Sequence, residues 1–230
     1  AIQRHLSGHG LRQLVSFEYQ DAGIRVRGRW YPLVKMQWVD GVALNAYVGD
    51  HVDDPTVLRD LSRQWLELTR GLREAQMAHG DLQHGNVLVE AGQLRLVDYD
   101  GVFVPEFAGE RSPEEGHPNY QSPRRRDDFG PELDGFSAWV IFLSVYALSV
   151  APYLWDQLDA GDECRLLRRA DFEHPDQSAG LRALEEVGDH RLLQLVGHFR
   201  KVLECPPLRV PPVDVECSLG RPALSGAAPA

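Results

Sequence analysis

The spacing of hydrophobic residues divides the chain into a strand-like beginning and a helical remainder. Residues 14–39 contain short runs rich in β-branched and aromatic side chains, and the first of them alternates apolar and polar residues as a half-buried strand does. The runs are 14–19, 24–26 and 30–39, with a turn at 20–23. We therefore predict a small antiparallel meander, preceded by a short helical pattern in residues 1–14.

From Pro55 onwards the pattern becomes helical. Asp54 followed by Pro55 is a typical helix start, and hydrophobic residues then recur every three or four positions over about 20 residues. These residues are Leu58, Leu61, Trp65, Leu68, Leu72 and Ala75. Two short apolar strands follow at 87–89 and 94–97, and a turn at Ala91 and Gly92 joins them.

The second half of the chain combines a long loop with further helices. Residues 99–131 are rich in glycine, proline and charge, which predicts a long loop, and such loops are often functional. The apolar run 138–150 is shorter than the ~20 residues of a membrane span, so we expect a buried core helix. Helical patterns recur near 163–170 and 179–203, and the proline-rich segment 205–230 has the composition of a linker or disordered tail.

Charge and cysteine content exclude several classes of protein. The net charge of −10 argues against binding to nucleic-acid backbones or anionic lipid, and the short basic run 124–126 does not reverse this. Cys164, Cys205 and Cys217 are too widely spaced for a zinc site, which favours reduced thiols. No signal peptide opens the chain and no membrane span is expected, so we predict a cytoplasmic protein.

The strongest chemical signal lies around the two short strands. Asp81 precedes the first strand, Asn86 follows five residues later, and Asp98 comes directly after the second strand. This order resembles the catalytic loop H-R-D-x-x-x-x-N and the metal loop D-F-G of the protein-kinase superfamily.

Three further segments strengthen the resemblance. Residues 116–123, G-H-P-N-Y-Q-S-P, resemble the G-T-P-x-Y-x-A-P of protein kinases, and 134–139 resemble the D-x-W-S-x-G that opens their central helix. Residues 34–41 look like the strand and hinge between the two kinase lobes. The resemblance implies an α+β, protein-kinase-like fold with a mainly helical C-lobe and a partial antiparallel β N-lobe. The implied parts are a partial N-lobe with hinge strand (1–40), a C-lobe (41–204) and the tail (205–230).

The resemblance also assigns roles within an ATP- and Mg²⁺-dependent site. Asp81 would accept the proton of the attacking hydroxyl, while Asn86 and Asp98 would supply hard oxygen ligands to Mg²⁺. Asp134 would accept hydrogen bonds from the backbone near His79, which would have a packing role.

For the nucleotide, the resemblance implies contacts from the hinge. Backbone groups of Gln37 and Val39 would bind adenine, Met36 would line the back of the pocket, and Leu88 would pack under the base.

Several positions depart from the kinase pattern. Gly80 replaces the arginine of H-R-D, Gln83 replaces a usual lysine, Asp100 replaces the glycine of D-F-G, and Arg124 replaces a glutamate. Gly80 and Asp100 resemble the aminoglycoside-phosphotransferase-like branch, whereas residues 116–139 resemble protein kinases. This combination of motifs resembles that of an atypical bacterial kinase.

A complete kinase also needs a glycine-rich loop and a lysine on its third strand. No glycine-rich loop precedes the hinge, and neither Lys35 nor Lys201, the two lysines, has the right position. We therefore expect an N-terminally truncated domain that binds ATP too weakly for turnover unless the full-length protein supplies these parts.

Three functions remain open at this point. The leading hypothesis is a protein kinase that transfers the γ-phosphate of ATP to a serine or threonine hydroxyl of a protein substrate. The alternatives are a small-molecule kinase of the phosphotransferase-like branch, and a pseudokinase that binds partners or nucleotide without transfer.

Overall fold

The computed structural model describes residues 2–161 and 166–213. The long helix expected after Asp54 is α3 (Pro55–Glu74). The Asp54 carboxylate caps it by accepting hydrogen bonds from the backbone N–H groups of Thr56 and Val57, at 3.0 and 3.2 Å. Its apolar stripe is buried, as the periodicity predicts. The helix therefore presents one face to the core and leaves its charged face exposed.

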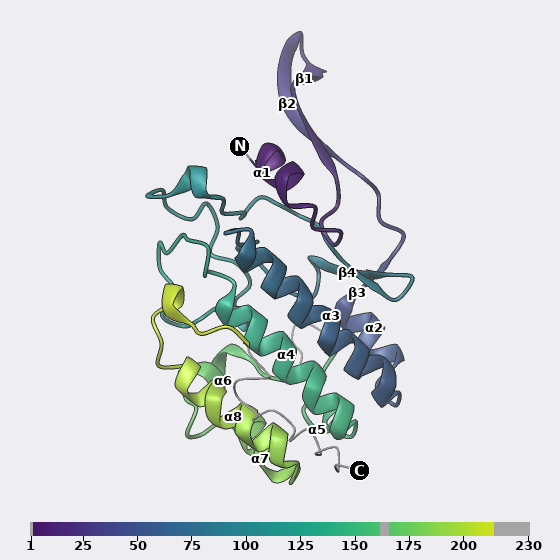
Figure 1. The fold of residues 1–230 in the computed structure, drawn as a ribbon, viewed down its shortest axis with the longest axis vertical. Coiled ribbons are helices and arrows are strands. Elements are labelled where there is room, and N and C mark those ends of the chain that lie inside the picture. Colours follow the sequence, from purple (N-terminus) through teal and green to yellow (C-terminus); the bar gives the residue numbers. More distant parts are fainter. Residues whose placement is uncertain (1, 162–165, 214–230) are drawn as a thin grey trace, which may run out of the picture.

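The partner of that stripe is α4 (Gly135–Val150), which runs alongside α3 (Figure 1). Nearly every side chain of α4 is buried, including those of three serines, as expected for a central core helix. The indole nitrogen of Trp65 donates to the backbone oxygen of Ala138 at 3.0 Å, which fixes the two helices against each other. Among the helices that the structure describes, none is both long and apolar enough to cross a membrane.

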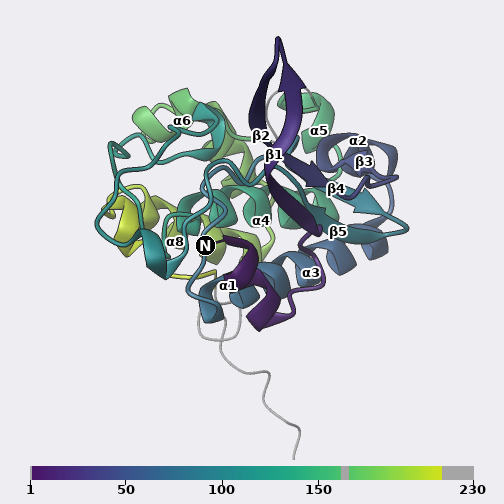
Figure 2. The ribbon, with the colours of Figure 1, turned by 90° about the horizontal axis from the view of Figure 1, so that it is seen from above.

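Short helices complete the mostly helical C-terminal part. They are α2 (Leu44–Asp50), α5 (Leu154–Gln157), α6 (Arg169–Glu173), α7 (Ala179–Glu186) and α8 (His190–Val202), with 3₁₀ turns η1 (Pro105–Phe107), η2 (Pro118–Tyr120) and η3 (Pro207–Arg209). Viewed from above, the helices gather around α4 (Figure 2). The long segment between β5 and α4 has only short 3₁₀ turns, as expected for a loop.

The strands form two small antiparallel sheets. One contains β3 (Val42–Ala43), β4 (Val87–Glu90) and β5 (Gln93–Leu96), in that order. The other is a hairpin of β1 (Phe17–Val26) and β2 (Arg29–Met36), which projects away from the helices (Figure 1). The expected fold class, α+β with small antiparallel sheets and a mainly helical C-terminal part, is confirmed.

The predicted three-run meander is wrong in one respect: its first two runs belong to the single strand β1. The residues expected to form a turn at 20–23 are instead absorbed by a register shift between Gln20 and Ile24. The chain reverses at Arg27 and Gly28, whose φ values of 48° and 83° are those of a two-residue hairpin turn.

The N-terminal segment reaches the helical part through α1 (Ile2–His9) and the residues after it. The imidazole Nε2 of His5 lies 2.7 Å from the backbone oxygen of Ala75, at the end of α3. Further on, Leu14 pairs with Leu96 of β5 in a parallel bridge. The base of the hairpin is therefore attached beside β5.

The beginning of the segment 205–230 packs on the helical part. Pro207 and Val210 are buried, and the indole nitrogen of Trp139 donates to the backbone oxygen of Pro211 at 2.8 Å. Residues 214–230, which include Cys217, lie outside the described residues, as does Cys164. Cys205 is a half-buried free thiol.

Candidate active site

The loop between α3 and β4, residues 75–86, carries Asp81 and is held from beneath by Asp134. Asp134 Oδ2 accepts the backbone N–H of His79 at 2.5 Å, and its Oδ1 accepts that of Gly80 at 2.9 Å. Asp134 is buried, which raises the pKa of its carboxyl, whereas these donors and the nearby Arg125 guanidinium act in the opposite direction. The predicted support of the loop by Asp134 is confirmed.

His79 packs inside the domain, as expected. Its Nε2 lies 2.9 Å from the backbone oxygen of Val97, and its ring meets the Tyr99 ring edge-on at 6.1 Å. The Tyr99 hydroxyl lies 2.9 Å from the backbone oxygens of both Val15 and Leu96, and burial raises its pKa. His79 and Tyr99 thus connect the Asp81 loop, the end of β5 and the N-terminal segment.

Asp81 and Asn86 lie in direct contact. The Asn86 amide nitrogen donates to Asp81 Oδ2 at 3.1 Å and to the Asp81 backbone oxygen at 3.0 Å. Asp81 Oδ1 accepts the backbone N–H of His117 at 2.7 Å. Because the amide nitrogen of Asn86 faces Asp81, its carbonyl oxygen is the group that can serve as a ligand.

Asp98 directly follows Val97, whose backbone N–H donates to the backbone oxygen of Asn86 at 3.0 Å, and Asp98 has a left-handed backbone at φ 65°. Its Oδ1 accepts the backbone N–H of Asp100 at 3.5 Å. Desolvation raises the pKa of Glu114, and the carboxylates of Asp98, Asp100 and Asp81 raise it further. The charges of all three aspartates thus act on the Glu114 carboxyl. The loop with Asp81, the loop with Asp98 and the segment 112–117 therefore form an acidic cluster.

Steric crowding explains why position 80, where the kinase pattern has arginine, is a glycine. Gly80 has φ 86°, and a Cβ atom there would overlap the backbone oxygen of Gly101. The segments that contain Gly80 and Gly101 are held together by the bridge between Ala78 and Phe103. In this bridge the N–H of Phe103 donates to the Ala78 oxygen at 2.8 Å. A side chain at position 80 is therefore incompatible with this arrangement of the two loops.

Arg125 is a site residue that the sequence reasoning missed, because it lies within the basic run 124–126. Its guanidinium is buried, and its Nη1 donates to the backbone oxygen of Gly80 at 2.8 Å. Its Nη2 donates to Ser112 Oγ at 2.9 Å and to the Glu114 backbone oxygen at 2.8 Å. Nothing in the local sequence distinguishes it from its two neighbours, since only the folded chain brings it to Gly80.

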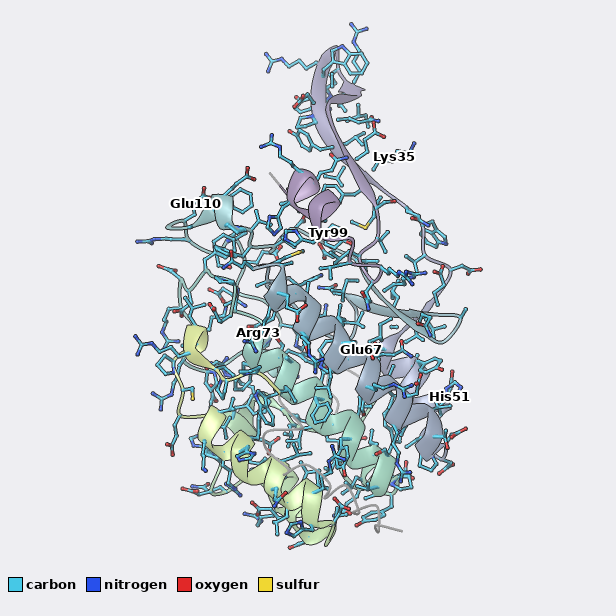
Figure 3. All side chains as sticks on the ribbon, viewed as in Figure 1. Lys35, His51, Glu67, Arg73, Tyr99 and Glu110 are labelled. Atoms are coloured by element: carbon cyan, nitrogen blue, oxygen red, sulfur yellow. The ribbon has the colours of Figure 1, made fainter. Side chains whose placement is uncertain are left out.

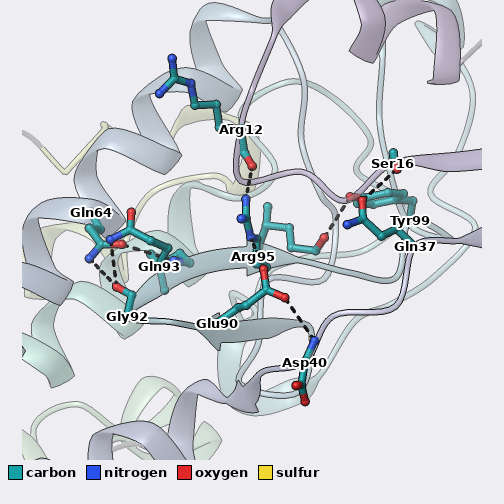
Figure 4. A network of polar contacts seen from close by, with 12 residues as sticks. Arg12, Ser16, Gln37, Asp40, Gln64, Glu90, Gly92, Gln93, Arg95 and Tyr99 are labelled. Carbon is teal, nitrogen blue, oxygen red and sulfur yellow. Dashed lines mark hydrogen bonds and ion pairs between the residues drawn. The ribbon is translucent and has the colours of Figure 1, made fainter.

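The residues expected to bind the nucleotide lie at the end of β2, in the segment after it and in β4. Met36, which ends β2, and Leu88, in β4, are half-buried, and Val39 is buried. The backbone N–H of Gln37 donates to the oxygen of Ser16 at 3.0 Å, and its side-chain oxygen accepts from Ser16 Oγ at 3.1 Å. Gln37 therefore binds the N-terminal segment through both groups (Figure 4).

The residues after Gln37 are tied to the β4–β5 hairpin through a chain of polar contacts (Figure 4). The N–H of Asp40 donates to Glu90 Oε1 at 3.2 Å, and Glu90 Oε2 accepts from Arg95 Nε at 3.0 Å. Arg95 in turn donates to the backbone oxygen of Arg12 at 2.6 Å. The connection between the β1–β2 hairpin and the helical part thus has a defined course.

Neither lysine belongs to the loops that carry Asp81, Asn86 and Asp98. Lys35 lies on the projecting β1–β2 hairpin (Figure 3), and Lys201 lies in the last turn of α8.

The oxygen donors at this point are of the kind that Mg²⁺ prefers. Within residues 2–161 and 166–213, no group of three or more His, Cys, Asp and Glu side chains is arranged to hold a metal by itself. The Asn86 carbonyl and the Asp98 carboxylate are hard oxygen donors, and Mg²⁺ bound to a nucleotide takes few protein ligands. The acidic cluster, with its raised Glu114 pKa, is an environment that a divalent cation would neutralise.

Neither protein-family models nor curated proteins match the sequence. Among solved structures, the fold is similar to that of the Cydia pomonella granulovirus kinase PK-1, with a TM-score of 0.47 and 15% sequence identity. The match covers 64% of this chain and 53% of the viral kinase, so the chain spans about half the length of that protein.

Proposed function

We propose that this chain is a phosphotransferase domain of the protein-kinase superfamily that uses ATP and Mg²⁺. The observation that carries the proposal is the contact between Asp81 and Asn86 on a loop fixed by Asp134, with Asp98 close by. Such a cluster concentrates a proton acceptor and hard oxygen ligands at one point, which suits phosphoryl transfer.

In this proposal Asp81 orients the acceptor hydroxyl and takes up its proton as the oxygen attacks the γ-phosphorus. The bond between that phosphorus and the bridging oxygen of ADP breaks in the same displacement. Asn86 and Asp98 would hold Mg²⁺, which would neutralise charge on the phosphate oxygens. The hydrogen bonds from His117 and Asn86 keep the Asp81 carboxylate in one orientation, so little reorganisation precedes the transfer.

For the base of the nucleotide, we assign the adenine contact to the backbone of Val39 rather than to the N–H of Gln37. The latter already donates to Ser16. Met36 lines the back of the pocket and Leu88 packs under the base, and both side chains are half-buried.

The acceptor that we propose is a serine or threonine hydroxyl of a protein, in an atypical bacterial kinase of the cytoplasm. Support comes from the segment 112–117, which lies against Asp81 and is exposed at residues 113–115. An exposed segment beside the base gives an extended peptide a surface on which to lie.

A second candidate function is that of a pseudokinase. The observation that favours it is that Lys35 lies on the projecting β1–β2 hairpin and Lys201 lies in the last turn of α8, so neither is on the loops of the acidic cluster. A site without a lysine on the phosphates can bind nucleotide and still transfer poorly.

The test combines binding and transfer in the full-length protein. Calorimetry measures ATP affinity with and without Mg²⁺, and labelled γ-phosphate is followed into a generic protein substrate and into small hydroxyl acceptors. Transfer to protein that is lost in Asp81→Asn, but kept in the exposed control Asp53→Asn, supports the kinase. Mg²⁺-dependent binding without transfer identifies a pseudokinase, transfer to small acceptors alone identifies a small-molecule kinase, and no binding at all refutes the proposal.

A further inference from the structure

The basic run 124–126 contains three arginines with different surroundings. Arg124 Nε donates to the backbone oxygen of Leu203 at 3.3 Å, on the side of α8. Arg126 is exposed and donates to backbone oxygens within its own turn. Arg125 alone of the three faces Gly80, and only 8% of its surface is accessible. Burying a guanidinium has a high desolvation cost, which calls for a specific compensation.

The compensation for Arg125 comes from two separate stretches of chain. Its Nη1 donates to the carbonyl of Gly80, the residue directly before Asp81. Its Nη2 donates to Ser112 Oγ and to the Glu114 carbonyl, three residues before His117. One rigid, planar group therefore fixes the distance between the Asp81 loop and the segment 112–117.

The backbone at Gly116 is fitted closely to this point. A Cβ atom at Gly116 would lie 3.0 Å from both Arg125 Nη1 and Asp81 Oδ1, and 2.6 Å from Gln121 Nε2. Gln121 Nε2 is itself a second donor to the Gly80 carbonyl, at 3.3 Å. The guanidinium, the carboxamide and the catalytic carboxylate thus converge on the same glycine, with His117 next to it.

The negative charges around Arg125 favour the protonated, cationic form of its guanidinium. Burial lowers the pKa of the guanidinium, and the carboxylates of Asp134, Asp81, Asp128 and Glu114 oppose that shift. Two of these, Asp134 and Asp81, belong to the support and the proposed base of the active site. Arg125 is therefore coupled to the site by charge as well as by hydrogen bonds.

We propose that Arg125 is a positioning residue for Asp81. By joining the Gly80 carbonyl to the segment 112–117, it places the N–H of His117 on Asp81 Oδ1 and so sets the orientation of the carboxylate toward the acceptor hydroxyl. This inference rests on the proposed function for its catalytic consequence, whereas the link between the two segments stands on the hydrogen bonds themselves.

The experiment compares Arg125→Met, Arg125→Lys and the neighbouring control Arg124→Met in the full-length protein. Arg125→Met is expected to lower kcat about 100-fold, the scale of a small misplacement of a reacting group, with the KM for ATP within about twofold of the parent. Arg125→Lys should recover about tenfold, because an ammonium satisfies one carbonyl but cannot span both segments. Arg124→Met should retain the parent kcat.

Hydrogen exchange of the backbone amides of 112–117 gives a readout that does not need activity. Arg125→Met should accelerate their exchange about tenfold or more relative to α3 amides, while Arg124→Met should not. Parent-like kcat in Arg125→Met, or an equal fall in Arg124→Met, overturns the positioning role. If the parent itself transfers no phosphate, the proposed function fails, and unchanged exchange in Arg125→Met would then also refute the link.

Discussion

Asp134 Oδ2 lies 2.5 Å from the backbone nitrogen of His79, a residue 55 positions earlier in the chain. Its other carboxylate oxygen accepts the N–H of Gly80. The first residue of the central helix region thus fixes the loop that carries Asp81. Since Asp134 is buried and lies beneath that loop, it can influence the site without touching a substrate.

Replacing Asp134 by alanine should leave two buried N–H groups without acceptors. We expect the free energy of unfolding to fall by about 1–3 kcal/mol, together with a loss of phosphate transfer. Urea denaturation of Asp134→Ala and Asp134→Asn measures this. The asparagine variant keeps one acceptor oxygen, and its free energy of unfolding should fall by less. Equal stability of the parent and Asp134→Ala would contradict the supporting role.

The sequence is sufficient to predict those parts of the site that follow from local order. The two strands that follow Asn86, the loop position of Asp81 and the support by Asp134 all come from residues at characteristic spacings. Arg125 could not be found in this way, because its partners Gly80 and Glu114 are 45 and 11 residues away. Its role depends on a three-dimensional contact that no local pattern records.

In the fold, too, some elements follow from the local sequence and others depend on contacts between distant residues. The helices α3 and α4 follow from periodicity and hydrophobic run length, whereas the bulge in β1 depends on how Gln20 and Ile24 pair with β2 across the hairpin. Likewise, the proline-rich composition near Pro207 favours a linker, but the packing of residues 207–211 on α4 depends on surface that α4 leaves open.

Asp81 and Asp98 should fail in different ways when replaced in the full-length protein. Asp81→Asn is expected to reduce transfer about 100- to 10,000-fold with nearly unchanged nucleotide affinity, because a proton acceptor acts mainly in the transition state. Asp98→Ala should abolish Mg²⁺-dependent nucleotide binding as well as turnover. Calorimetry and single-turnover transfer separate the two effects, and an equal loss of binding in both variants would refute these separate roles.

Glu114 should titrate above its usual value of 4.5, because desolvation and the carboxylates of Asp98, Asp100 and Asp81 raise its pKa, while His79 opposes them. A raised pKa in the folded state means that the contribution of Glu114 to stability is present below its unfolded pKa and is lost as the pH rises through the folded pKa. Carboxyl NMR titration measures this directly. Asp98→Asn should bring the Glu114 pKa down, whereas the distant control Asp53→Asn should not change it.

Gly80→Ala should destabilise the protein for two reasons that a control can separate. The methyl group would overlap the oxygen of Gly101, and the φ of 86° is unfavourable for any L side chain. Gly28 has a similar φ of 83° but open space around it, so Gly28→Ala reports the conformational part alone. We expect Gly80→Ala to cost about 1–3 kcal/mol more than Gly28→Ala in thermal or urea unfolding. Equal costs would show that the Gly101 contact is not restrictive.

The β1–β2 hairpin should promote self-association, because it presents large apolar side chains on an otherwise unpaired two-stranded sheet. These are Tyr19, Ile24, Val26, Trp30, Tyr31 and Val34. Trp30→Lys should lower the concentration-dependent light scattering of the purified chain. Tyr153→Lys, at an aromatic side chain of similar exposure near α5, is the control and should have little effect.

The contact between Gly80 and Gly101 has a consequence for how proteins of this kind diverge. A mutation that introduces arginine at position 80 cannot be accepted alone, because the chain at Gly101 must first move away, and that movement would displace the Asp98 loop joined to it. Positions 80 and 101 are therefore expected to change together in evolution. Homologues that retain glycine at position 80 are expected to keep the short path from Asp98 to Phe103, and those with a side chain there are expected to have a longer or differently bent segment, a correlation that an alignment can test.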